Sequence, residues 1–252
     1  MSKIRLWKYM SNFEFLLDIL ENKRLYLANI NKMNDPLEYY IPLRFSDTDV
    51  KNILDIKGVN YSFEKNMEYS LGSFPLNISD FLFAKKNYEN KELTNYLKTV
   101  KYYTVAKKHI ENAKICSLSN SKNHPLMWSH YANGHTGYCV EISIDPGRVE
   151  KVKYENFKER GAELSNNYKR DTLKCLKHKH ESWAYEEEYR IISFNKNQYF
   201  DDFKIENVTL GSSISKFQKE FIESLCKRKK IEHQTINSFS TNGLGILSVK
   251  LY

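Results

Sequence analysis

Residues 183–192 read W-A-Y-E-E-E-Y-R-I-I, and no other stretch says as much about both fold and function. Its second half is rich in residues that favour strands. Because successive side chains of a strand point to opposite faces, Glu186, Glu188 and Arg190 would share one face and Glu187 the other. Packing alone does not require two carboxylates and a guanidinium there, since a buried charge must be paired or change its pKa. The stretch predicts a functional site; the alternative is a solvated edge strand whose glutamates pair with Arg190 and nearby lysines.

Outward from this stretch, the chain predicts an α+β fold. Strands are expected over residues 3–9, 25–28, 114–119, 136–144, 187–194, 207–210, 231–237 and 245–251, and helices over 11–21, 125–133, 160–180 and 215–229. Ser11 and Glu14 have the spacing of a capping box. Strands and helices mix without the regular rhythm of βαβ units, which favours α+β. We expect a single domain over residues 1–252, with a helical insertion at about 46–112.

Composition is that of an ordinary soluble globular protein. No apolar run approaches the length needed to span a bilayer, so no membrane association is expected. The N-terminal residues lack the apolar core of a secretory signal. The four cysteines are far apart and form no C-x-x-C pair, which disfavours a metal clamp or redox motif. Free thiols indicate a reducing compartment, and we expect a cytoplasmic protein.

The formal net charge is +8, which favours contact with nucleic acid or a phosphate-bearing ligand. The alternative is that a chain rich in lysine and asparagine reflects the base composition of its genome. Residues 169–180 are strongly basic and come just before the glutamates. A solvated helix face is the default interpretation, but beside a carboxylate site this segment could steer an anionic substrate.

Other candidate ligand-binding residues lie in two segments. Ser117 and Ser119 end a predicted strand on one face, where hydroxyls bind an amide or ribose, or satisfy backbone groups of the next turn. His130 and Tyr131 belong to the densest aromatic and histidine stretch and could line a substrate cleft, although a core helix also explains them. His130 and His135 are five residues apart, a poor spacing for two metal ligands on one helix face, so no metal is predicted.

Several enzyme classes lack their motifs. No Gly-rich phosphate loop, G-x-S-x-G or H-E-x-x-H occurs, which disfavours P-loop, Rossmann, α/β-hydrolase and zincin proteins. A metal-dependent nuclease built from Asp35, Glu38, Glu186 and Glu188 stays open. So does a nucleic-acid-binding module without catalysis, which rests on the charge and on abundant tyrosines for stacking.

Four motifs occur in order along the chain. They are L-x-K-Y at residues 6–9, N-D-P-x-E at 34–38, M-W-x-H-Y-A-x-x-H-x-G at 127–137 and W-x-x-E-x-E-x-R at 183–190. In these motifs and their order, the chain resembles a widespread bacterial family of unknown function. That family often has arginine after K-Y, where this chain has Met10. The resemblance by itself implies no activity.

The chain is also similar, more loosely, to ADP-ribosyltransferase-like folds. Such folds present, in order, a basic or histidine residue on the first strand, a serine-rich strand, and E-x-E at the start of a later strand. Arg5, then Ser117 and Ser119, then Glu186 and Glu188 stand in that order. The similarity implies a central mixed or antiparallel sheet of that type, with NAD as the cofactor.

The same similarity implies a role for each residue. Glu188 would stabilise the oxocarbenium character that develops when the nicotinamide–ribose bond breaks, and Glu186 would position or deprotonate the acceptor. Arg5 would clamp a phosphate, and Tyr9 or Tyr185 would stack on nicotinamide. We therefore expect an NAD-dependent transferase that modifies nucleic acid or protein, in a bacterial toxin or phage-defence setting.

Overall fold

The computed structural model describes residues 2–33, 43–44, 109–122, 124–156, 162–163, 168–241 and 247–251. The chain divides into one unit of Met1–Ala28, Lys114–Val152 and Ser182–Tyr252, and a second of Asn29–Ala113 and Lys153–Glu181. The motif at 34–38 lies outside the described residues. So does the predicted helical insertion, except for its last four residues.

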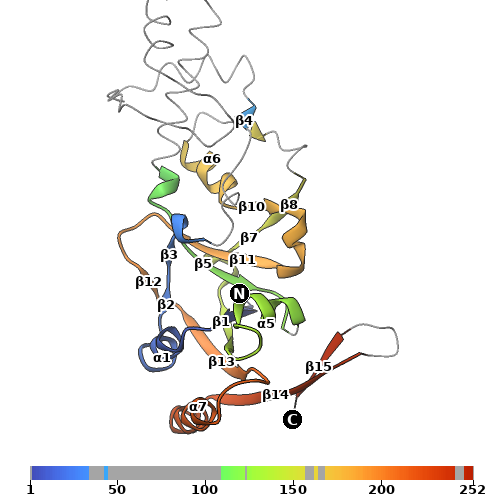
Figure 1. Ribbon diagram of the computed structural model, residues 1–252. Helices are drawn as coiled ribbons and strands as arrows, with labels where there is room; N and C mark the ends of the chain where they lie inside the picture. Colours follow the sequence, from blue (N-terminus) through green and yellow to red (C-terminus); the bar gives the residue numbers. More distant parts are fainter. Residues whose placement is uncertain are drawn as a thin grey trace, which may run out of the picture. The chain divides into compact units, whose positions relative to one another are not determined.

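A central sheet organises the first unit. Eight of its nine strands are β1 (Ile4–Met10), β5 (Lys114–Ser119), β6 (Tyr138–Ile144), β7 (Glu150–Lys151), β11 (Glu188–Ser193), β13 (Phe203–Leu210), β14 (Glu232–Thr241) and β15 (Leu247–Leu251). They run in the order β15-β14-β13-β6-β1-β5-β11-β7 (Figure 1). Neighbours are antiparallel except β13 and β14, which are parallel. The predicted α+β class, with a mainly antiparallel sheet, is confirmed.

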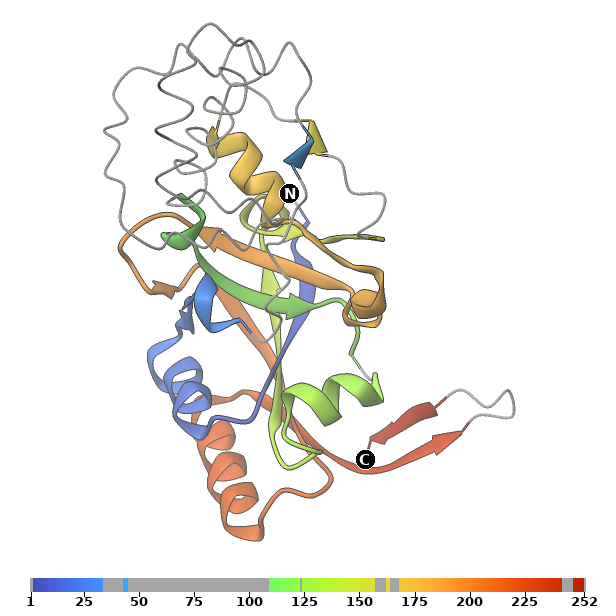
Figure 2. The ribbon, with the colours of Figure 1, turned by 45° about the horizontal axis from the view of Figure 1, so that its top comes forward.

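Helices cover both faces of this sheet. Helices α1 (Phe13–Asn22) and α7 (Lys216–Lys229) lie on one side of the strands and α5 (Pro125–Tyr131) on the other (Figure 2). The larger core joins α1 and α7 to the sheet through buried aliphatic residues, among them Leu6, Leu16, Leu20, Leu118, Val140, Ile142, Leu210, Ile222 and Leu225. A smaller cluster packs α5, through Met127 and Trp128, against Tyr9, Cys139 and Ile236. The four cysteines are free and buried.

Short elements complete the described chain. In the first unit, β2 (Leu25–Tyr26) pairs with β12 (Tyr199–Phe200), and the 3-10 helix η2 (Pro146–Arg148) follows β6. Strand β3 (Ala28–Asn29) spans the boundary between the units. The second unit has η1 (Ile30–Lys32) and α6 (Tyr168–Cys175). Its strands β4 (Leu43–Arg44) and β8 (Lys153–Glu155) pair in parallel with β9 (Ala162–Glu163) and β10 (His178–His180), respectively.

Two predicted helices differ from the structure. The cap of α1 is Asn12 and not Ser11, because the Asn12 side chain accepts a hydrogen bond from the backbone N–H of Phe15 at 3.1 Å. Of the helix predicted over 160–180, the described residues form a helix only in α6, whereas β9 precedes it and the histidine-rich end forms β10. Pairing with a distant strand, which no local pattern displays, decides the second difference.

Candidate functional site

The three consecutive glutamates mark the transition from the 3-10 helix η3 (Glu181–Glu186) into β11. Glu187 has a left-handed backbone, with φ of 44°. This single residue turns the chain so that Glu186 and Glu188 are both buried, each 3% exposed, while Glu187 is exposed as predicted. Glu186 ends η3, so the prediction that it shares a strand face with Glu188 and Arg190 is wrong. The two buried carboxylates therefore belong to different elements, Glu186 to η3 and Glu188 to β11.

Glu188 is held by Arg190, two residues further along β11 and, as predicted, on the same face. The guanidinium donates from Nε to Oε1 and from Nη2 to Oε2, both at 2.8 Å, and the Arg190 side chain is fully buried. A bidentate pair of this kind fixes the orientation of the carboxylate as well as its charge. Removing either partner would break a buried ion pair, which is strongly destabilising.

Ser119 connects the glutamates to the neighbouring strand. It lies directly opposite Glu188 in the register of β5 and β11, and opposite Trp7 in that of β5 and β1. Its Oγ donates to the backbone carbonyl of Glu186 at 2.6 Å and accepts from the backbone N–H of Ser121 at 2.9 Å. Ser117 lies two residues before Ser119, on the same face of β5, and is opposite Arg190. The structure thus brings the serine-rich strand and both glutamates together.

Helix α5 contacts Glu186 through a tyrosine side chain. The Tyr131 hydroxyl donates to Oε1 of Glu186. Burial raises the pKa of Tyr131, and the neighbouring Glu186 carboxylate raises it further, so the phenol stays a proton donor. Next to it, Nδ1 of His130 lies 2.8 Å from the Tyr185 hydroxyl. Two hydrogen bonds therefore join the predicted residues of α5 to those of η3.

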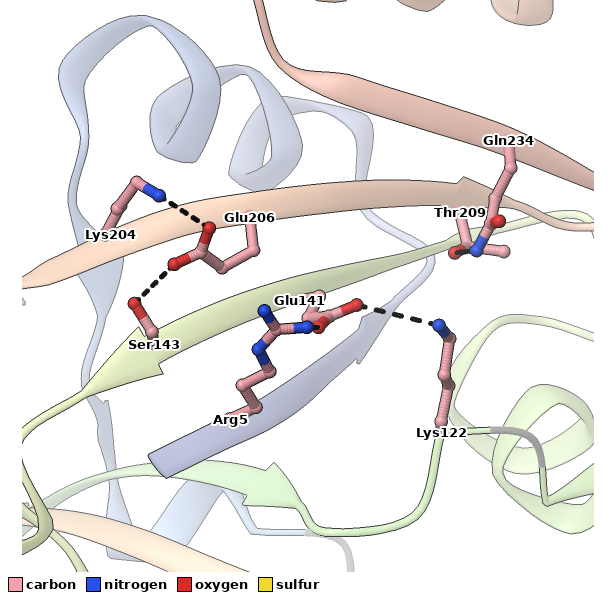
Figure 3. Close-up of polar contacts among 8 residues, drawn as sticks. All are labelled: Arg5, Lys122, Glu141, Ser143, Lys204, Glu206, Thr209 and Gln234. Carbon is pink, nitrogen blue, oxygen red and sulfur yellow. Dashed lines mark hydrogen bonds and ion pairs between the residues drawn. The ribbon is translucent and has the colours of Figure 1, made fainter. Parts of the chain in front are cut away.

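Arg5 and Tyr9 both lie on β1, but Arg5 is exposed and Tyr9 is buried. Arg5 is two-thirds exposed, and its guanidinium bonds to Oε1 of Glu141 on β6 at 3.1 Å (Figure 3). Tyr9 is buried with its ring edge-on to Trp128, and its hydroxyl donates to the Ser121 carbonyl at 2.8 Å. A covered ring cannot stack on nicotinamide. We therefore assign Tyr9 to holding the loop after β5, and of the two tyrosines predicted to stack only Tyr185 remains a candidate.

Three residues near the site were missed. Glu141 is buried in the middle of β6, and Lys122 lies 3.8 Å from its Oε2 (Figure 3). The signal for Glu141 was present, because it is the one charged residue in the run Y-C-V-E-I-S-I. His124 stacks on Tyr185, with ring centroids 5.4 Å apart. For Lys122 and His124 the sequence holds no such signal, since both belong to a polar loop.

A metal site and a membrane-spanning helix are both absent from the described residues. Among these, no three histidine, cysteine, aspartate or glutamate side chains group closely enough to hold a metal ion. Asp35 and Glu38, which the nuclease hypothesis needs, lie outside the described part. Over the same described range, no helix has the length and apolar character to cross a membrane.

Tyr131 and Glu186 both lie within one range of the chain that matches a protein family. Residues 127–191 match the family model "Protein of unknown function (DUF2971)". The match contains the motifs at 127–137 and 183–190, so the predicted resemblance to an uncharacterised family is confirmed for this range. Comparison with curated proteins and with solved structures gives no match.

Proposed function

We propose that the protein is an ADP-ribosyltransferase-like enzyme that uses NAD to modify a macromolecule, either nucleic acid or protein. One observation carries the proposal. Ser119, at the end of β5, lies directly opposite Glu188, at the start of β11, while β1 pairs with the other edge of β5. An arginine on the first strand, a serine strand and a glutamate strand are thus immediate neighbours in the order that this chemistry uses.

The reaction breaks the bond between C1′ of the ribose and the nicotinamide nitrogen. Nicotinamide leaves with the electron pair, and positive charge develops on the ribose ring. Glu188, oriented by Arg190, would stabilise this charge. An acceptor N–H or O–H then bonds to C1′, and its proton passes to Glu186, which would act as the general base.

The surrounding groups support these roles. Arg5 is exposed enough to bind a phosphate of NAD, and Tyr185 offers an aromatic ring next to Glu186. Both carboxylates are buried in this conformation. The proposal therefore requires the Tyr131–Glu186 contact to open when NAD binds.

Release of nicotinamide tests the proposal. The protein is incubated with NAD and with single-stranded RNA, single-stranded DNA or a protein mixture as acceptors. We expect wild type to release nicotinamide and Glu188→Gln to do so about 100-fold more slowly, a size typical of losing one group that stabilises the transition state. No release by wild type with any acceptor would overturn the proposal, and so would an unchanged rate in a folded Glu188→Gln protein.

A further inference from the structure

Four ring side chains form a partly exposed group, here called the aromatic cluster: His124, His130, Trp183 and Tyr185. His124 stacks on Tyr185 at 5.4 Å with an interplanar angle of 30°, and the Trp183 ring lies 6.1 Å from Tyr185. The hydrogen bond between His130 and the Tyr185 hydroxyl fixes Tyr185 between them. The rings of His124 and Trp183 thus both lie against a side chain whose hydroxyl is held by a hydrogen bond.

A layer of positive charge lies on the same sheet face as Glu188, over β13, β6 and β1. Arg5 and Lys204 are 67% and 66% exposed and Lys122 is 38% exposed, whereas their partners Glu141 and Glu206 are only 7% and 21% exposed (Figure 3). The carboxylates therefore lie beneath and the cations point outward. Arg5 and Lys204 belong to one cross-strand row and are two strands apart, which is roughly 10 Å.

Lys122 makes this layer continuous with the aromatic cluster. Its ammonium group lies over Glu141, and the same loop reaches His124 two residues later. Tyr9 holds the loop in place through its hydrogen bonds to the carbonyls of Ser121 and Lys122. A cation, Lys122, and a ring that can stack, His124, therefore lie two residues apart in the chain, and Tyr9 anchors the segment at Ser121 and Lys122.

We propose that this combined surface binds single-stranded nucleic acid, with phosphates on Lys122 and Lys204 and an unpaired base stacked on Trp183 or His124. Single-stranded nucleic acid would then be the acceptor of the proposed reaction, and to that extent this inference rests on the proposed function. Cationic side chains that follow the backbone, together with aromatic rings that take bases, are how proteins bind single strands. A duplex keeps its base faces covered and offers such rings nothing to stack on.

Binding is measured without NAD, by fluorescence anisotropy of labelled 12-nucleotide strands. The probes are DNA, RNA of the same sequence, a strand of abasic sites and the DNA duplex. We expect both single strands to bind at least about 10-fold more tightly than the abasic strand and the duplex. A difference between RNA and DNA tells which polymer is preferred, and either preference supports the proposal.

Two sets of variants separate stacking from charge. Trp183→Ala should weaken binding of the base-containing strands about 10-fold and leave the abasic strand unaffected, whereas Trp183→Phe should retain binding. Lys122→Gln and Lys204→Gln should each lower the slope of log K against log salt by about one. Phe217→Ala and Lys216→Gln, on the exposed side of α7, are the matched controls and should change nothing.

Equal affinity for abasic and base-containing strands would overturn the proposal, as would tighter binding of the duplex or no binding at all. These outcomes are distinct from a failure of the proposed function. A protein that binds single strands but releases no nicotinamide contradicts the transferase and keeps this surface. A protein that releases nicotinamide but does not bind single strands keeps the transferase and contradicts this surface.

Discussion

Tyr131 donates a hydrogen bond to the carboxylate of Glu186, and this contact joins two segments 55 residues apart in the chain. It connects the helix that carries M-W-x-H-Y to the turn that carries E-x-E, both within the range of the family match. The bond keeps a buried carboxylate supplied with a donor, and it also lies where the acceptor of the proposed reaction must arrive. Stability therefore depends on this bond, and the proposed reaction would depend on its opening.

The first prediction concerns this bond. Tyr131→Phe removes a donor from a buried carboxylate, which typically costs about 1–3 kcal/mol. Urea denaturation should show that loss of unfolding free energy. Tyr185→Phe, which removes a hydroxyl bonded to the exposed His130, is the control and should cost less. Equal losses for the two variants would contradict the importance given to the Glu186 contact.

The second prediction concerns the Glu188–Arg190 pair. Glu188→Ala breaks a buried ion pair and should reduce the free energy of unfolding by about 3–5 kcal/mol. Glu187→Ala, one residue earlier but exposed, should stay within about 0.5 kcal/mol of wild type. Thermal or urea unfolding of the two variants decides the matter. A mild effect at residue 188 would mean that the pair is solvated.

The third prediction concerns alkaline pH. Burial raises the pKa of the Cys226 thiol to about 11, and it also raises the pKa of Cys116. The folded protein keeps protons that the unfolded chain releases above about pH 8.5, so stability is complete below that pH and falls as pH rises toward 11. Each such group contributes a slope of about 1.4 kcal/mol per pH unit. Cys226→Ala should make the decline between pH 9 and 11 shallower, as measured by urea unfolding at several pH values; an identical slope would contradict the assignment.

The fourth prediction tests the start of α1. Asn12→Ala removes the side-chain acceptor for the N–H of Phe15 and should cost about 1 kcal/mol. Ser11→Ala should be nearly neutral, because Ser11 does not cap the helix. Chemical denaturation of both variants compares them directly. The reverse ranking would restore the capping box that the sequence suggested.

Much of the central sheet could be predicted from the sequence, because its strands have strong local signals. Tyr138–Ile144 is a run of strand-forming residues, and all seven are buried. Local signals failed where distant contacts decide the structure. His178–His180 has no apolar alternation and becomes a strand only by pairing with Lys153–Glu155.

In the candidate site, too, local patterns predicted some contacts, and contacts between distant segments could not be predicted. Alternation predicted that Glu188 and Arg190 share a face, and the structure pairs them. No alternation could place Tyr131 on Glu186, since that contact depends on how α5 packs against the sheet. Nor could it show that the left-handed backbone of Glu187 would bury the glutamates on both sides of it.

The most direct test of the central claim is the initial rate of nicotinamide release from NAD by three adjacent variants, Glu186→Gln, Glu187→Gln and Glu188→Gln, measured side by side. Each removes one negative charge from the same three-residue run, and Glu187 bonds only to Asn120 among the side-chain contacts that the described structure gives it. We predict a rate near wild type for Glu187→Gln and a loss of about 100-fold for Glu188→Gln. For Glu186→Gln we predict the loss typical of a missing general base, at least about 100-fold in nicotinamide release measured with the acceptor present. Equal rates for all three folded variants, or a loss confined to Glu187→Gln, would contradict the proposed active site.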